Sequence, residues 1–147
     1  MSDDVLSQEF KRLYDQWEQA IHQKNWAWFA TYFAEDWIGT ARPWPALSLN
    51  RDQLIEIDKQ IESLDAQWIK VEAHRFGDTV VTAVVSRIGN EEFKPGGHLA
   101  EGVATTQEFN EYCAGNEIAY AGAWRHNGQN WQMFDHRMIG IIKGYEA

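Results

Sequence analysis

The stretch Ile118–Ile141, with the sequence IAYAGAWRHNGQNWQMFDHRMIGI, decides the fold, because its pattern predicts a β-hairpin. Two alternating runs flank a turn at 126–129 (HNGQ), where Asn-Gly is a strong hairpin signal because both residues tolerate positive φ. The second run carries Asp135, His136 and Arg137 in its middle, where a plain core strand would carry Val or Ile. We therefore expect the hairpin to supply part of the core and part of any functional site.

Alternation along the second run leaves two orientations open. Trp131, Asp135 and Arg137 share one face, and His136 lies on the other. If the first face is interior, Asp135 and Arg137 form an ion pair on a pocket floor, or Arg137 binds a ligand carboxylate that Asp135 orients. If the second face is interior, His136 enters the pocket as a candidate general base. Our working hypothesis is that Arg137 faces the pocket.

The size and charge of the chain limit what it can be. Its 147 residues fit a single domain spanning 1–147, which can bury roughly 68–70% of its unfolded surface. A formal net charge of −9 argues against a nucleic-acid-binding surface, which needs clustered Lys and Arg. We expect a cytoplasmic protein without a membrane partner, because no window has the ~18 apolar residues of a membrane span and the start, MSDDVLSQ, lacks signal-peptide features.

Metal and cofactor chemistry find little support in the sequence. The single cysteine, Cys113, has no partner for a disulfide, and the five histidines are dispersed, none at ligand spacing with a carboxylate. The chain also lacks a Walker loop, a G-x-S-x-G motif and a G-x-G-x-x-G motif. We therefore expect neither a metal nor a cofactor.

Aromatic residues make up 14% of the chain and include eight tryptophans. Aromatic side chains fill cores, and the polar handles of Trp and Tyr also suit them to pocket walls. Two kinds of interior are therefore open, a solid aromatic core or a partly hollow one with an aromatic wall.

Hydrophobic periodicity predicts that helices come first and most strands follow. The expected elements are helices at 4–22, 26–33 and 51–64, and strands at 37–41, 66–75, 79–88 and in the hairpin. The first helix carries Tyr14 and Trp17 on its buried stripe, from which they can reach a pocket. This order predicts an α+β fold rather than βαβ units.

Two irregular segments carry further candidates. Arg42 and Trp44 each precede a proline, which holds them extended on a stiff loop at the rim of a site. Segment 89–117 is either a lid or a mobile loop, and His98 is an ionisable residue within it. Its part 103–112 either adds a strand or packs over a cavity mouth.

Three stretches together resemble the SnoaL-like and NTF2-like superfamily, and the resemblance covers nearly the whole chain. They are WEQAIHQKNWAWFATYFAEDW (17–37), SLNRDQLIEI (48–57) and AWRHNGQNWQMFDHRMIG (123–140). The resemblance implies a cystatin-like α+β fold, in which N-terminal helices pack on a strongly curved, mainly antiparallel sheet that forms a conical pocket. It does not settle function, because members include isomerases, cyclases, dehydratases, epoxide hydrolases and non-catalytic association domains.

The resemblance also provides a negative test for one activity. Ketosteroid isomerases of this superfamily use a tyrosine on the first helix, an aspartate base and a second, protonated aspartate. The corresponding positions here fall near Trp17, Ala41 and Gly122, none of which can act in these roles. Tyr14 lies one turn away and could replace the tyrosine, but no base follows, so the resemblance argues against steroid isomerisation.

We expect a small-molecule-binding protein whose ligand is apolar and can carry an acidic group. Its chemistry would be general acid–base catalysis of the isomerase, cyclase or dehydratase type, with His136, Asp135 and Tyr14 as catalytic candidates. The ligand-binding candidates are Trp17, Arg42, Trp44, His98, Trp124, Trp131 and Arg137. We also expect a homodimer, because an exposed apolar sheet face is otherwise an aggregation hazard. The alternative is a non-catalytic dimerisation or association module, and whether the protein is an enzyme stays open.

Overall fold

The computed structural model describes residues 3–42, 44–100 and 104–145. Within these ranges the chain forms helices and strands in the following order: α1 (Asp3–Gln23), α2 (Trp26–Tyr32), β1 (Phe33–Ala41), β2 (Leu47–Asn50), α3 (Arg51–Asp58), β3 (Ile61–Phe76), β4 (Thr79–Phe93), β5 (His98–Ala100), β6 (Ala104–Thr105), α4 (Thr106–Cys113), β7 (Asn116–His126) and β8 (Trp131–Gly144).

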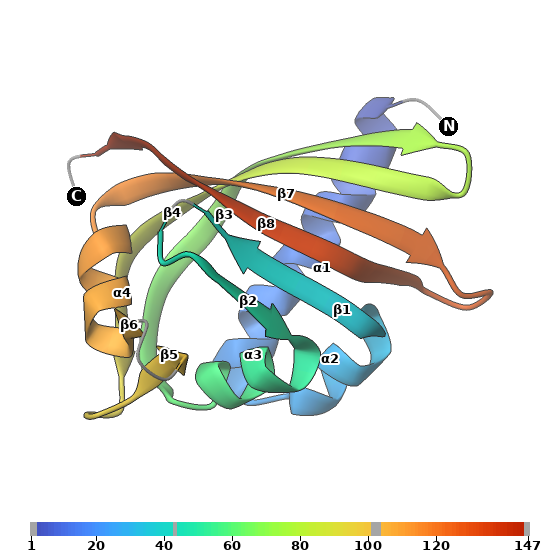
Figure 1. Cartoon of the computed structure of the whole chain (residues 1–147). Helices are drawn as coiled ribbons and strands as arrows, with labels where there is room; N and C mark the ends of the chain where they lie inside the picture. The colour runs from blue at the N-terminus through green and yellow to red at the C-terminus, as the bar shows by residue number, and fades with distance from the viewer. Residues whose placement is uncertain (1–2, 43, 101–103, 146–147) are drawn as a thin grey trace.

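The long strands build one twisted sheet in the order β2-β1-β8-β7-β4-β3. Neighbouring strands are antiparallel except for β1 and β8, which run parallel. Figure 1 shows α1 running across one side of this sheet, with α2 and α3 together below it and α4 at one end. The predicted α+β cone with a curved, mainly antiparallel sheet is confirmed.

The core begins with the buried stripe of α1. Leu6, Phe10, Tyr14 and Trp17 follow the spacing of one helix face, and all four are buried. Their aromatic rings pack on the inner face of the sheet, where Phe10 meets Trp124 edge-on at 5.1 Å between ring centroids. Around Phe10, Tyr14 and Trp124, the space between α1 and the sheet is therefore filled by aromatic rings.

The predicted hairpin is confirmed, but its turn is longer than expected. The loop 127–130 joins β7 to β8 and is closed by the backbone N–H of Asn127, which donates to the carbonyl of Asn130 at 3.0 Å. Asn127 Oδ1 accepts from the backbone N–H groups of Gln129 (2.9 Å) and Asn130 (2.8 Å). Gly128 has a φ of +100°, whereas Asn127 does not adopt positive φ. An asparagine side chain therefore organises a four-residue loop in place of a two-residue turn.

The third helix is shorter than predicted. We expected it to extend to Leu64, but α3 ends at Asp58 and β3 begins at Ile61. β3 pairs with β4 along its whole length, from Ile61 opposite Phe93 onwards, so backbone pairing in the sheet outweighs the helical pattern of the side chains.

Segment 89–117 is more ordered than a mobile loop within its described part. β4 continues to Phe93, the short strands β5 and β6 pair, and α4 occupies Thr106–Cys113 where a strand or cover was expected. The start of α4 is a capping box, in which Thr105 Oγ1 accepts from the N–H of Glu108 (3.0 Å) and Glu108 Oε1 accepts from the N–H of Thr105 (3.1 Å). The sequence T-x-x-E at 105–108 is the signal that predicts this helix.

Candidate functional site

A cavity of about 160 Å³ lies between the sheet and the helices at the end of the cone that α1 leaves unfilled. Its wall is mainly apolar and is formed by residues of α1, β1, β2, α3, β4, β7 and β8 together with Leu99 and Phe109. A second cavity of about 70 Å³ adjoins it, and Trp17, Ile21, Glu91 and Tyr120 line both. A mainly apolar cavity with a few polar groups is the usual form of a small-molecule site.

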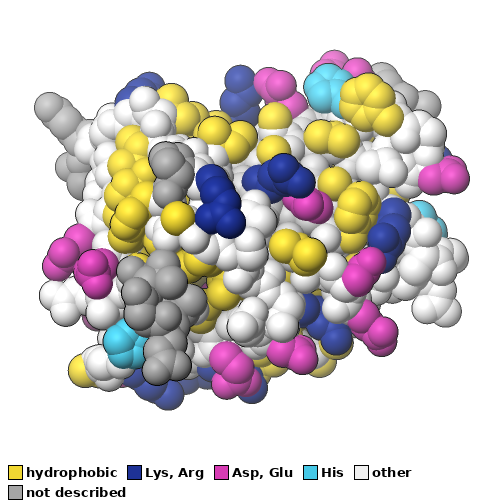
Figure 2. Space-filling model, in the orientation of Figure 1, with side chains coloured by type: hydrophobic (Ala, Val, Ile, Leu, Met, Phe, Trp, Pro, Cys, Tyr) yellow, Lys and Arg dark blue, Asp and Glu magenta, His cyan; other side chains and the backbone are white. Residues whose placement is uncertain are grey.

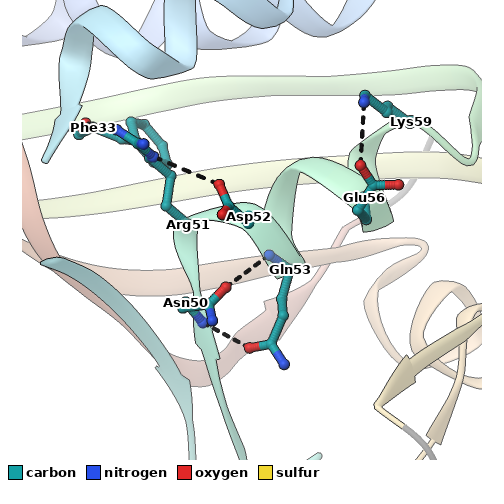
Figure 3. Close-up of polar contacts among 7 residues, drawn as sticks. All are labelled: Phe33, Asn50, Arg51, Asp52, Gln53, Glu56 and Lys59. Atoms are coloured by element: carbon teal, nitrogen blue, oxygen red, sulfur yellow. Dashed lines mark hydrogen bonds and ion pairs between the residues drawn. The ribbon is translucent and has the colours of Figure 1, made fainter. Parts of the chain in front are cut away.

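Asp58 enters the cavity at the end of α3. The start of this helix is held by a capping box between Asn50 and Gln53, with hydrogen bonds of 2.8 and 2.9 Å, shown in Figure 3. Arg51 Nη1 also donates to the carbonyl oxygen of Phe33 at 3.2 Å, which ties the helix to the beginning of β1. These contacts fix the direction of α3, so its last residue, Asp58, is buried (7% exposed) and lines the cavity.

Glu91 reaches the cavity because β4 contains a bulge. Even-numbered residues from 80 to 88 are buried against the core, which would place Glu91 outside. The pairing of β4 with β3 gains an extra residue at Gly89, and one extra residue exchanges the two faces of a strand. A side chain at Gly89 would collide with the carboxylate of Asp65. Beyond the bulge, Glu91 and Phe93 line the cavity.

His136 reaches the cavity through a second bulge, in β8. The pairing with β7 shifts at Phe134, so that Met133 before the bulge and His136 after it are both buried. The His136 ring stacks on Tyr120 at 5.1 Å and meets Trp17 edge-on at 5.2 Å between ring centroids. These two rings hold the imidazole at the cavity wall.

Burial perturbs the ionisation of the three polar groups. It raises the pKa of Asp58 well above its ordinary value, and the nearby Glu91 carboxylate raises it further. The Trp17 indole N–H lies close enough to the carboxyl to offset part of the effect, but it does not reach hydrogen-bond geometry. Burial also raises the pKa of Glu91 to about 7. It lowers the pKa of His136 to about 3, so this imidazole is neutral at physiological pH.

Several buried polar atoms in this cavity have no hydrogen-bond partner in the described part of the chain. They are Trp17 Nε1, Trp37 Nε1, Asp58 Oδ2 and His136 Nε2. Within the described residues, one other buried side-chain atom, Arg87 Nε, shares this property. Buried polar groups in native proteins are nearly always paired, so their concentration around one cavity needs an explanation.

Tyr14 and Trp124, which the sequence suggested for the site, belong to the core instead. Neither lines the cavity, and both are fully buried. The Tyr14 hydroxyl is hydrogen-bonded to Thr82 Oγ1 at 2.9 Å, and Trp124 Nε1 donates to the same oxygen at 3.2 Å. A Cβ atom on Gly122 would lie 2.6 Å from both hydroxyl oxygens, so glycine at this position permits their approach.

The hypothesis that Arg137 faces the pocket is wrong. Its side chain is 65% exposed on the outer face of the sheet, and its Nε donates to Asp135 Oδ1 at 2.9 Å. The bulge at Phe134 is the physical reason, because it turns His136 inward and Asp135 and Arg137 outward. The argument for an acidic group on the ligand rested on Arg137 and loses its basis here.

The remaining candidates divide between the cavity and other places. Trp17 lines the cavity, whereas Trp131 packs on Phe10 at the opposite end of the sheet. His98 is exposed in β5 and lines an open groove beside α4 rather than the cavity. Trp44 packs against Tyr112 of α4 with the two rings tilted, at 4.5 Å between ring centroids. Arg42 is exposed and does not line the cavity.

Sequence reasoning missed Asp58, Glu91 and Tyr120. Asp58 lies four residues after Leu54 and therefore on the apolar stripe of its helix, which is a readable signal. Gly89, directly after the β-branched run 79–88, is the corresponding signal for the bulge before Glu91.

Among residues 3–42, 44–100 and 104–145, no group of three or more His, Cys, Asp or Glu side chains is arranged to hold a metal ion. In the same ranges, no helix combines the length and apolar character needed to cross a membrane.

Comparison with known proteins identifies the fold. No family model matches the chain, and no curated protein matches it. An NTF2-like protein from Cytophaga hutchinsonii superposes with a TM-score of 0.65 at 17% identity, covering 96% of this chain and 100% of that one. An NTF2-like superfamily protein from Salmonella enterica gives 0.66 at 10% identity, covering 97% and 95%.

A third structure, a putative Ca/calmodulin-dependent kinase II association domain from Exiguobacterium sibiricum, gives a TM-score of 0.65 at 9% identity and covers 98% of both chains. At these identities the likeness defines the fold, and the chain has the NTF2-like fold over nearly its full length. Function has to be argued from the site.

Proposed function

We propose that the cavity binds a small, mainly apolar molecule whose polar end lies against Asp58, Glu91 and His136. The observation that carries this proposal is the set of unpaired buried atoms, Trp17 Nε1, Trp37 Nε1, Asp58 Oδ2 and His136 Nε2, around one cavity. Leaving a buried polar group unpaired costs about 1–3 kcal/mol, so a ligand that pairs several of them gains both affinity and orientation.

The size of the cavity limits the ligand. An engineered protein cavity of about 150 Å³ holds benzene, and the cavity here measures about 160 Å³. The enclosed part of the ligand is therefore about the size of one six-membered ring with a short substituent. The adjoining space of about 70 Å³ can take a second small group.

The two carboxyl groups are suited to exchange protons with such a ligand. Burial raises the pKa of Asp58 well above its ordinary value and so favours its protonated form, which can donate a hydrogen bond or a proton. Glu91, whose pKa is raised to about 7, is available in both forms and can act as a base. Carboxyl groups whose pKa values are raised by burial are typical of proton-transfer sites, so proton transfer is the reaction class that this proposal favours.

Nuclear magnetic resonance with benzyl alcohol as probe tests the binding proposal. We expect saturable shifts of the indole N–H signals of Trp17 and Trp37. Ala41→Leu narrows the cavity from β1 and should weaken binding at least tenfold. The matched control is Ala123→Leu. Ala123 lies opposite Asp135, whose side chain is on the outer face of the sheet, and it does not line the cavity. Equal effects of the two variants, or no binding to the wild type, would overturn the proposal.

The outer face of the sheet supports a second proposal, the homodimer expected from the sequence. Ile38, Val81 and Ile139 are exposed by 48%, 39% and 57%. Figure 2 shows hydrophobic side chains spread over the side of the molecule seen in Figure 1, with Lys, Arg, Asp and Glu side chains between them. The fold is shared with the Exiguobacterium sibiricum structure described as a putative association domain, which is in keeping with assembly through such a face.

A further inference from the structure

Apart from His136 and Tyr120, the ionisable side chains that line the cavity are all carboxyl groups. Asp58 and Glu91 line the main cavity, and Glu18 lines the adjoining one. No lysine or arginine among the described residues lines either space. His136 supplies a neutral ring rather than a positive charge. A ligand with an acidic group would meet two carboxyl groups and no counter-charge.

The same groups match the needs of a protonated amine. An ammonium group donates hydrogen bonds and accepts none, and it requires oxygen or nitrogen acceptors. Asp58 is 7% exposed with Oδ2 unpaired, and His136 is 5% exposed with Nε2 unpaired. Both atoms belong to groups that line the cavity, where the Glu91 carboxyl adds further acceptor oxygens. A bound ammonium group favours the ionised form of a neighbouring carboxyl, so Asp58 accepts hydrogen bonds in this complex even though burial favours its protonated form in the empty cavity.

Aromatic rings complete this environment. Trp17 and Trp37 line the same cavity, and the faces of indole rings attract cations, most strongly in desolvated sites. Tyr120 lines it as well. Carboxyl groups combined with aromatic faces distinguish a cation site from one that merely tolerates a neutral molecule.

We infer that the ligand of this cavity is a small organic amine with an apolar, ring-sized body, bound in its protonated form between Asp58, Glu91 and the Trp17 ring. This inference rests on the proposed function, because it names the class of molecule that the same cavity binds. The two unpaired indole N–H groups would be satisfied by an oxygen on the amine, such as a hydroxyl or an ether.

Three probes of matched shape test the inference: benzylamine, benzyl alcohol and benzoate. Their dissociation constants are measured at pH 7.5 from the indole N–H signals of the tryptophans. We expect benzylamine to bind at least tenfold more tightly than benzyl alcohol, and benzoate to bind most weakly. Glu91→Gln and Asp58→Asn should each reduce the preference for benzylamine about tenfold and change the affinity for benzyl alcohol less than about threefold.

Glu92→Gln is the matched control, because Glu92 neighbours Glu91 in sequence, is exposed and does not line the cavity. It should leave the preference for benzylamine unchanged. Binding of benzyl alcohol without a preference for benzylamine would overturn the inference and leave the proposed function intact. Failure of all three probes to bind would overturn both.

Discussion

Replacing Glu91 by glutamine tests whether burying the Glu91 carboxyl group lowers the free energy of unfolding. Burial raises its pKa from an ordinary value of 4.5 to about 7. Each pKa unit corresponds to about 1.4 kcal/mol, so the full shift is worth about 3 kcal/mol in the free energy of unfolding. Because the residue as a whole is half-buried, water access will reduce this figure, and we expect an effect of about 1–3 kcal/mol.

The direction follows from proton binding by the two states. Below pH 4.5 the carboxyl is protonated in the folded and the unfolded chain, and it adds no pH dependence. Between pH 4.5 and about 7 the unfolded chain loses this proton first, so the folded state binds more protons and stability falls as the pH rises. Above pH 7 the carboxyl is ionised in both states, and stability falls no further on its account. Glutamine cannot ionise, so the Glu91→Gln variant should gain about 1–3 kcal/mol over the wild type between pH 4.5 and pH 8.

The assay is urea unfolding of both proteins at intervals from pH 4.5 to pH 8. The groups beside Glu91 bear on the result. Removing the Glu91 charge also lowers the pKa of Asp58, which adds to the gain, whereas Tyr120, Cys113 and His136 do not ionise in the folded protein in this window. His136 titrates here in the unfolded chain, but equally in both proteins, so its contribution cancels in the stability difference. Asp58→Asn in the same background separates the two contributions. A stability difference that stays constant across this pH range would refute the burial of the Glu91 carboxyl.

Three further predictions concern other parts of the fold. Gly122→Ala should cost about 2–4 kcal/mol in thermal or urea unfolding, because the new Cβ displaces two buried, hydrogen-bonded hydroxyls; Gly144→Ala, where the nearest atoms lie at 3.7 Å, is the control and should cost less than about 1 kcal/mol. The ring protons of His136 should not titrate between pH 5 and pH 8 in NMR spectra of the folded protein, in keeping with a pKa of about 3, and should titrate once urea unfolds the chain. Ile139→Lys on the outer sheet face should convert a dimer into a monomer in light scattering, and an unchanged mass would contradict the proposed interface.

The fold could be predicted from the sequence because its strongest local signals agree with the tertiary structure. The apolar stripe predicted for the helix at 4–22 is the buried face of α1. The alternating runs on either side of Asn-Gly form the strands β7 and β8. The boundaries were less predictable where two patterns compete. The apolar spacing at 54, 57, 61 and 64 continues a helix on paper, but the chain from Ile61 onwards gains more from pairing with β4.

The site was harder to predict, because it depends on features that periodicity does not encode. The alternation rule assigned Asp135 and Arg137 to one face with Trp131, and it would have been correct for an unbroken strand. One extra residue at Phe134 reverses the assignment. Of the catalytic candidates, His136 lines the cavity while Tyr14 and Asp135 do not. No sequence rule places a bulge with certainty, so the cavity wall could not be derived from the sequence.

The three polar groups of the cavity come from three separate elements. Asp58 is the last residue of α3, Glu91 follows the bulge at Gly89, and His136 follows the bulge at Phe134. Glu91 and His136 are turned toward the apolar interior by the bulges that precede them, whereas Asp58 lies there because it continues the apolar stripe of α3. Such placements oppose stability, since they bury unpaired polar atoms that a regular strand or helix would leave in water. Proteins tolerate local conflicts of this kind mainly at functional sites. Three polar groups from three separate elements thus converge on one cavity, two of them through bulges, and this convergence is the structural reason for the ligand proposed above.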